Sequence, residues 1–288
     1  FDKIRASIRF KHFKKTYDEN ILDIKGGLND VVMNNSPIDI DKLIEGTNEI
    51  LTANRNSLQL FDMLHSMRQF DDLTYVHSVN VALIASILGQ WLKFSEKDIR
   101  ILTISGLLHD IGKIMIPNEI LTKPGKLTVA EYNIMKQHVN FGYEKVKNQN
   151  IDIRIKEACL LHHEKCDGTG YPFGLKSDHI PAVAKIIAIA DVYDAMTSAR
   201  VYRGALCPFE VIDTMYKDAF TKFEPEYILP FLKNVASSYI NNDVRLSDGR
   251  IGKVVLINEN ALSLPIVQCE DEFIDLSKTR GLTVSAIL

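Results

Sequence analysis

An apolar stretch near the middle of the chain, residues 107–113, carries three polar side chains that a buried helix rarely holds. His109 and Asp110 are adjacent, and Lys113 follows about one helical turn after His109. Burying a charge costs free energy unless the charge is paired or coordinates a metal. The stretch therefore predicts a buried site whose remaining members lie elsewhere in the sequence.

Polar residues of the same kind interrupt other strongly apolar segments. Helices are predicted over residues 76–92, 98–112, 129–147, 152–164 and 181–197. The polar residues set in or at the ends of these segments are His77, His109, Asp110, His138, His162, His163 and Asp191. A single histidine on an apolar face is structural about three times as often as it is a ligand. Seven such groups on helices that share one core favour a metal site instead.

The residue types indicate which chemistry such a site supports. Imidazole and carboxylate ligands together suit Mn, Fe, Zn and similar divalent ions. Seven groups exceed one tetrahedral site, so a two-metal centre is expected, with Asp110 able to bridge the ions. Two ions about 3.5–4 Å apart clamp a phosphodiester and generate a bridging hydroxide nucleophile. Lys113 is expected to stabilise charge on a phosphate oxygen.

Composition bounds the class of protein. The 288 residues are 46% hydrophobic and 25% charged, which is ordinary for a globular protein with a sizeable core. A net charge of -3 gives no support for DNA binding. The chain contains no bilayer-spanning apolar run, and its four cysteines form no CxxC pair, so free thiols in the cytoplasm are expected. The first residue is Phe1, so an upstream region is also expected, and membrane attachment through it stays open.

The predicted fold is mainly α, in three parts. Residues 1–70 are expected to form an N-terminal helical segment for packing, linking or dimerisation. Residues 71–242 carry the buried helices and are expected to form the catalytic domain. Residues 243–288 alternate in a strand-like way around the turn at Asp248 and Gly249, which predicts a small β-rich C-terminal element.

The order of the polar groups, from His77 to Asp191, resembles the HD superfamily of metal phosphohydrolases. The segment HHEKCDGTGYP at residues 162–172 resembles the signature of the HD-GYP subfamily. The segment DVYDAMTSARVYR at residues 191–203 is similar to the one that follows that signature. The resemblance covers about residues 74–239 and implies an HD-type helical bundle around a metal centre.

The resemblance also implies an activity and roles for single residues. Members of the subfamily are phosphodiesterases for cyclic di-GMP, a bacterial second messenger. One metal would be held by His77, His109, Asp110 and Asp191, and the other by His138, His162 and His163, with Asp110 bridging. The implied contacts to substrate come from Lys113, Gly170, Tyr171, Pro172, Asp194, Arg200 and Arg203. The metals would be Fe or Mn, and Asp194 would alternatively orient a neighbour by pairing with Arg200 or Lys113.

One position departs from part of the family. Some members carry a glutamate four residues before the first histidine and bind a third metal, whereas this chain has Leu73 there. Two metals are therefore expected, with linear pGpG rather than GMP as the main product. Two alternatives stay open: hydrolysis of another nucleotide, such as cyclic GMP-AMP or a dNTP, and a low-turnover sensor or interaction module. A homodimer, an upstream sensory domain or a diguanylate cyclase partner are compatible with the sequence.

Overall fold

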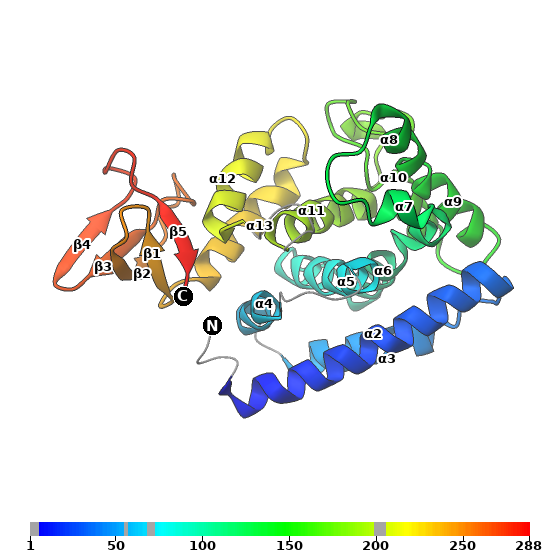
Figure 1. Ribbon diagram of the computed structural model, residues 1–288, viewed down its shortest axis with the longest axis horizontal. Helices are drawn as coiled ribbons and strands as arrows, with labels where there is room; N and C mark the ends of the chain where they lie inside the picture. The colour runs from blue at the N-terminus through cyan, green and yellow to red at the C-terminus, as the bar shows by residue number, and fades with distance from the viewer. Residues whose placement is uncertain (1–5, 55–56, 68–72, 199–205) are drawn as a thin grey trace.

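The computed structural model describes residues 6–54, 57–67, 73–198 and 206–288. It is mainly helical, with a small sheet at the C-terminal end (Figure 1). The α-helices are α2 (Ile8–Asn34), α3 (Ile40–Ala53), α4 (Ser57–Ser66), α5 (Leu73–Trp91), α6 (Glu96–Leu108), α7 (Asn118–Leu121), α8 (Val129–Met135), α9 (His138–Val146), α10 (Ile153–Leu161), α11 (Ala182–Thr197), α12 (Pro208–Asp218) and α13 (Pro225–Ser238). Two 3₁₀ segments are η1 (Ile111–Met115) and η2 (Ser177–His179). The predicted mainly α class with a β appendage is confirmed.

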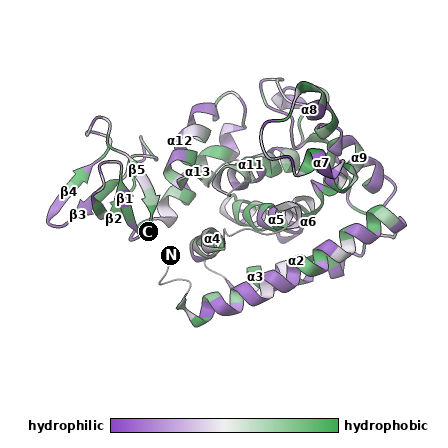
Figure 2. Cartoon of the chain, in the orientation of Figure 1, coloured by the Kyte–Doolittle hydropathy of each residue, from purple (hydrophilic) through white to green (hydrophobic). Residues whose placement is uncertain are grey.

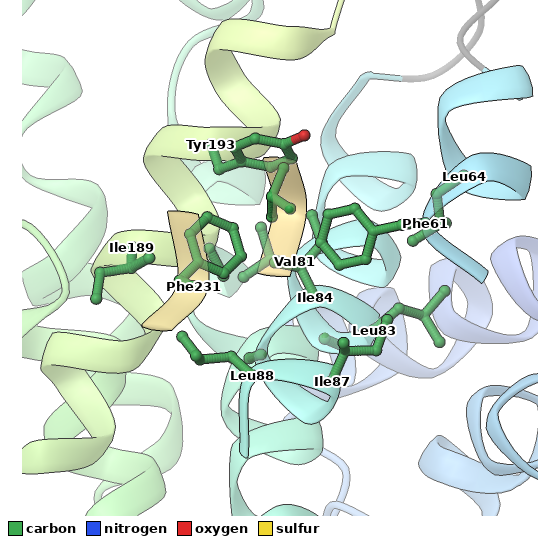
Figure 3. Packing of buried hydrophobic residues seen from close by; sticks show 14 of the residues in the cluster. Phe61, Leu64, Val81, Leu83, Ile84, Ile87, Leu88, Ile189, Tyr193 and Phe231 are labelled. Atoms are coloured by element: carbon green, nitrogen blue, oxygen red, sulfur yellow. The ribbon is translucent and has the colours of Figure 1, made fainter. Parts of the chain in front are cut away.

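The core is centred on α5, which is apolar nearly all round and packs against both α6 and α11. A helix without a polar face has to be covered on every side, and α2, α3, α4 and α13 complete the cover. Phe61 of α4, Tyr193 of α11 and Phe231 of α13 meet in an aromatic cluster, with ring centroids 5.1–6.2 Å apart (Figure 3). This packing holds α5 and α11 in fixed positions, and both helices carry site residues.

Three of the predicted helices end earlier than expected, and each end lies at the site. The helix predicted to reach residue 112 stops at Leu108, and η1 follows. The helix predicted over residues 129–147 is divided into α8 and α9 at Lys136 and Gln137. The helix predicted to reach Glu164 stops at Leu161. These predicted helix ends were wrong because the apolar periodicity of the sequence continues past the point where the helix stops. There the backbone turns, and the turn directs the following side chains into the site.

The N-terminal helices form one side of the molecule. Along α2, hydrophilic and hydrophobic residues alternate with helical spacing (Figure 2), and its apolar side packs on α3 and α5. Ser7 caps α2 by accepting a hydrogen bond from the backbone of Phe10, and Asp39 caps α3 in the same way from Lys42. Lys145 of α9 donates a hydrogen bond to the backbone carbonyl of Val32. The N-terminal segment is therefore packed against the helices that carry the site.

The C-terminal sheet is antiparallel, with strand order β4-β3-β2-β1-β5. Its strands are β1 (Asp243–Leu246), β2 (Ile251–Leu256), β3 (Ile266–Cys269), β4 (Glu272–Asp275) and β5 (Val284–Ile287). Alternate residues such as Val244 and Val254 are fully buried, and β5 packs near α12. The predicted hairpin is confirmed, with Gly249 at a φ of 92° in its turn, a conformation that glycine adopts readily.

The four cysteines lie in the described residues and are free thiols, as the sequence predicts. Burial raises the pKa of the Cys159 thiol to about 12, so this thiol stays protonated at neutral pH. Among the helices of the described ranges, none has the length and apolar character needed to cross a bilayer.

Candidate metal centre

The seven predicted ligand residues come from five helices and meet at one place. His77 lies in the second turn of α5, and His109 and Asp110 directly follow the end of α6. The other members are His138 at the start of α9, His162 and His163 after α10, and Asp191 in α11. Six of the seven are buried and only His163 is partly accessible, at 24% exposure of its side chain. Residues up to 114 positions apart in the sequence thus converge at one buried site.

Their ligand atoms form two groups within the described residues. One group contains Asp110, His138, His162 and His163, and the other contains His77, His109 and Asp191. In each group, one ligand atom from every residue lies within 4.8 Å of the others. The grouping agrees with the division between two metals that the family resemblance implies, and the ligand roles themselves stay a prediction.

Asp110 lies between the two groups. Its Oδ1 is 3.3 Å from Nε2 of His138 and 3.7 Å from Nε2 of His162. Its Oδ2 is 3.3 Å from Nε2 of His109 and 3.5 Å from Nε2 of His77. Each carboxylate oxygen therefore faces a different histidine group, which is the arrangement that a bridging ligand requires.

Asp191 also faces both groups, which the sequence did not reveal. Its Oδ1 is 3.0 Å from Nε2 of His77, and its Oδ2 is 3.7 Å from Nδ1 of His163. Burial alone would raise the pKa of Asp191, but the close contact with His77 and the charges of His163 and His77 hold that pKa well below its usual range. Asp191 is thus an ionised carboxylate, which is the form that binds a metal.

Three of the histidines are fixed with Nε2 directed into the site. Nδ1 of His109 lies 2.7 Å from the carbonyl oxygen of Gly106, and Nδ1 of His138 lies 2.7 Å from that of Met135. Nδ1 of His162 lies 3.0 Å from the carbonyl oxygen of Ala158. A carbonyl only accepts, so each Nδ1 donates and the neutral ring keeps its lone pair on Nε2. Outer hydrogen bonds of this kind hold metal-binding imidazoles in place.

His77 is fixed by a carboxylate instead of a carbonyl. Its Nδ1 lies 2.7 Å from Oδ2 of Asp194, which is 1% exposed. Burial favours the neutral ring, but Asp191 and Asp194 outweigh burial and raise the pKa of His77 to about 9. The carboxylate of Asp194 thus orients His77, and its predicted substrate contact and its pairing with Arg200 or Lys113 stay predictions.

The site fits divalent metal ions. Within the described part of the chain, Nε2 of His77, Nε2 of His109 and Oδ1 of Asp110 are buried without a hydrogen-bond partner. Buried polar atoms are rarely left so, because each one costs its full desolvation free energy. Burial lowers the pKa of His138 to about 3 and also lowers that of His109, which keeps both imidazoles neutral. A buried cluster of imidazole and carboxylate side chains is compatible with a divalent metal centre.

A sequence model described as the HD domain matches residues 45–227 of the chain. The chain belongs to the HD domain family. It is 36% identical over 203 residues to "Cyclic di-GMP phosphodiesterase PA4108" of Pseudomonas aeruginosa, which covers 70% of this chain and 49% of the relative. It is 36% identical over 173 residues to "3'3'-cGAMP-specific phosphodiesterase 1" of Vibrio cholerae, with 59% of this chain and 38% of the relative covered.

The predicted family relationship to the HD-GYP phosphodiesterases is confirmed by these similarities. The chain spans about half the length of the curated cyclic di-GMP phosphodiesterases it matches first. Bd1817, an HDG"Y"P protein from Bdellovibrio bacteriovorus, shares the fold with a TM-score of 0.63 and 17% identity. That match covers 78% of this chain and 72% of Bd1817.

Lys113 of this HD domain lies on η1 and donates a hydrogen bond from Nζ to Oδ2 of Asp110. Its side chain is 19% exposed, so the ammonium lies at the boundary between the buried cluster and solvent. Gly112 allows η1 to approach α9 closely, because a Cβ there would lie 2.0 Å from the carbonyl oxygen of His138. Burial opposes ionisation of Asp110, but His109 and Lys113 outweigh it and hold the Asp110 pKa well below its usual range.

The predicted recognition loop lies against the cluster. The Tyr171 ring is stacked on the His163 ring, with centroids 4.7 Å apart and planes at 28°. Gly170 makes this approach feasible, since a Cβ there would lie 2.5 Å from the backbone of Glu164. One face of the His163 ring is thereby covered by Tyr171.

Glu164 is a site residue that the sequence reasoning missed. Its buried carboxylate accepts hydrogen bonds from the backbone of Phe173 at 2.7 Å, Gly174 at 3.1 Å and Leu175 at 2.9 Å. The residue directly follows His163, so one short segment supplies two histidines and the anchor of the loop. A glutamate directly after two consecutive histidines was the sequence feature that could have indicated this role.

Arg200 and Arg203, which the resemblance implies as substrate contacts, lie outside the described residues. The position at which some family members carry an additional glutamate is occupied by Leu73, the first residue of α5. The substrate contacts of the two arginines therefore stay a prediction.

Proposed function

We propose that this chain is a metal-dependent phosphodiesterase that hydrolyses cyclic di-GMP, mainly to linear pGpG. The position of Asp110 carries the proposal, because its two oxygens face two separate histidine groups beside the ammonium of Lys113. Several curated relatives of the HD domain are named cyclic di-GMP phosphodiesterases, which supports the choice of substrate. The proposed cofactors are two divalent ions per chain, Fe or Mn.

The seven ligand residues would hold the two ions, with Asp110 shared between them. When bound, such a pair supplies Lewis acidity toward the phosphodiester and lowers the pKa of water. Lys113 places a positive charge at the accessible edge of the cluster, where it stabilises negative charge that develops on a phosphate oxygen. His163 and Tyr171 close the other side, and the flat face of Tyr171 offers a surface for a guanine base.

The substrate choice can be tested with a panel of nucleotides. Purification without oxygen, metal analysis, and a turnover assay with added Mn or Fe(II) would compare cyclic di-GMP, cyclic GMP-AMP and dNTPs. Cyclic GMP-AMP belongs in the panel because a relative of similar identity is named for it. We expect fastest turnover of cyclic di-GMP, and brisk hydrolysis of dNTPs without that activity would overturn the proposal. Binding of the dinucleotide with no turnover by the metal-loaded chain would favour a sensor.

The number of metals and the product are predicted together. Because Leu73 offers no oxygen or nitrogen, we expect two metals per chain and pGpG as the dominant early product. Metal analysis of freshly purified protein and chromatography of a reaction time course measure the two quantities. A content of three ions would contradict the first expectation, and early accumulation of GMP would contradict the second.

Replacing Glu164 with Gln is expected to weaken substrate binding more than catalysis. The amide keeps the shape of the carboxylate but turns an NH₂ group toward backbone N–H donors that now bind oxygen. We expect KM for cyclic di-GMP to rise about tenfold, as for a lost hydrogen bond to a charged group. The exposed loop acid Asp167 offers a control, since Asp167→Asn leaves the Glu164 anchor intact. An unchanged KM in Glu164→Gln would show that the loop does not contact substrate.

The domain division and the partners are also proposals. We keep residues 71–242 as the catalytic domain, 1–70 as a helical packing segment and 243–288 as a β-rich element. Phe61 of α4 packs into the central core, which is consistent with a packing role for the first segment. A homodimer, an upstream sensory domain or cyclase partner, and a cytoplasmic location are proposed from the sequence.

A further inference from the structure

A chain of buried hydrogen bonds leads from the N-terminal helix α2 to the imidazole of His77. Tyr17 of α2 donates its hydroxyl to Oδ1 of Asn80, and Nδ2 of Asn80 donates to Oδ1 of Asp194 at 2.9 Å. The other oxygen of Asp194 accepts from Nδ1 of His77 at 2.7 Å. We infer that Tyr17 and Asn80 are positioning residues for the proposed metal centre. The inference rests on the proposed metal-binding function of His77.

The direction of every bond in this chain is fixed by chemistry. The ionised carboxylate of Asp194 only accepts hydrogen bonds, so the NH₂ group of Asn80 has to face it. The amide oxygen of Asn80 then faces Tyr17, whose hydroxyl donates. Tyr17 is 2% exposed, Asn80 5% and Asp194 1%, so bulk water does not reach these groups to replace a lost partner. Rotating the amide would bring two acceptors together at Asp194, which buried groups do not tolerate.

The series of hydrogen bonds ends at His77, a proposed metal ligand, and fixes the orientation of its ring. Oδ1 of Asp194 also accepts from the hydroxyl of Ser198 at 3.2 Å, and Asn80 holds the same oxygen from α5. With Oδ1 held in this way, Oδ2 has a set position, and the ring of His77 follows it through Nδ1. Nε2 of His77 is thereby directed to Oδ1 of Asp191 at 3.0 Å. Loss of the Asn80 amide removes one of the donors that fix the Asp194 carboxylate, so the ring of His77 is held less firmly.

The inference predicts a specific pattern of metal affinities. Mn²⁺ would be titrated into the metal-stripped 288-residue chain, comparing wild type with Tyr17→Phe, Asn80→Ala and the double variant. Asn80→Ala should weaken the affected site about 10-fold and at most about 100-fold, because it acts through Asp194, the direct hydrogen-bond partner of the proposed ligand His77. Tyr17→Phe should weaken it about 2- to 30-fold, the range for substitutions within a coupled network. In the double variant, Tyr17→Phe should weaken Mn²⁺ binding no further, because Asn80→Ala already interrupts the series of hydrogen bonds.

A matched control is available between the same two helices. Tyr75 of α5 donates a hydrogen bond to Oδ1 of Asn29 of α2 at 3.2 Å, and this bond does not involve Asp194. Asn29→Ala should therefore leave the Mn²⁺ affinity at its wild-type value. Tyr17→Phe keeps the ring that packs on Phe13, with centroids 5.6 Å apart, and circular dichroism checks that each variant is folded.

The outcomes separate this inference from the proposed function. Unchanged Mn²⁺ affinity in both single variants, or effects that add in the double variant, would overturn the positioning roles while leaving phosphodiesterase activity intact. Normal Mn²⁺ binding by wild type without hydrolysis of cyclic di-GMP would overturn the function and leave the positioning roles measurable. Absence of Mn²⁺ binding by wild type would overturn both.

Discussion

Replacing Asp110 with Asn is expected to lower kcat for cyclic di-GMP by at least about 10³-fold, since a bound metal supplies several kcal/mol of transition-state stabilisation. The substitution changes only one oxygen to an NH₂ group, so the volume of the buried side chain is kept. An amide bears no negative charge and offers one acceptor atom instead of two. It therefore cannot serve both histidine groups that the two carboxylate oxygens now face.

Metal content should fall together with activity. The buried histidines keep their lone pairs directed inward through their own backbone hydrogen bonds, so the variant should still retain the fold. We expect metal analysis to show fewer than two ions per chain and thermal unfolding to lose its response to added Mn²⁺. Asp110→Ala should behave in the same way, which separates loss of the carboxylate from any effect of the new amide.

Another aspartate beside a histidine provides the control for Asp110. Asp178 lies 2.8 Å from Nδ1 of His179, but both side chains are exposed at the surface. Asp178→Asn should leave metal content and turnover at wild-type values. If Asp110→Asn retained its metals and its turnover, the proposed shared-ligand role would be excluded. If it lost turnover but preserved a cellular effect, the chain would act as an interaction module.

The convergence of the seven polar residues could be predicted from the sequence because each one interrupts an apolar segment. His77 and Asp191 lie within α5 and α11, whose apolar surfaces require burial on all sides. The helix ends could not be predicted from this pattern. His109, Asp110 and His162 follow the last residue of a helix, where the backbone turns although the sequence stays apolar.

Supporting residues were missed for a different reason. Asn80 and Tyr17 are ordinary residue types whose roles arise from neighbours distant in the sequence, whereas Glu164 binds the backbone of the loop that follows it. Asn80 and Asp194 are 114 positions apart, and no local spacing relates them. The same limit applies to the bond between His77 and Asp194, which are 117 positions apart in the sequence.

Replacing Lys113 with Met is expected to lower kcat about 10²- to 10³-fold, the effect of removing one group that stabilises charge in the transition state. Methionine keeps most of the length of the side chain and removes only the ammonium. Lys113 is not among the predicted metal ligands. Its ammonium donates a hydrogen bond to Oδ2 of Asp110, the oxygen that faces His77 and His109. Metal content should therefore remain at the wild-type value, in contrast to Asp110→Asn.

The contrast between the two variants is the sharper test of the site. Lys123 offers a matched control, since its ammonium pairs with Glu131 rather than Asp110 and Lys123→Met should leave kcat unchanged. Lys113→Arg keeps the charge but replaces a compact ammonium with a wider planar group, so it should recover only part of the loss. Steady-state kinetics with parallel metal analysis would measure both properties. Loss of metal in Lys113→Met would mean that the lysine supports the cluster instead of the transition state, because a residue that acts only on the phosphate leaves the ligands in place.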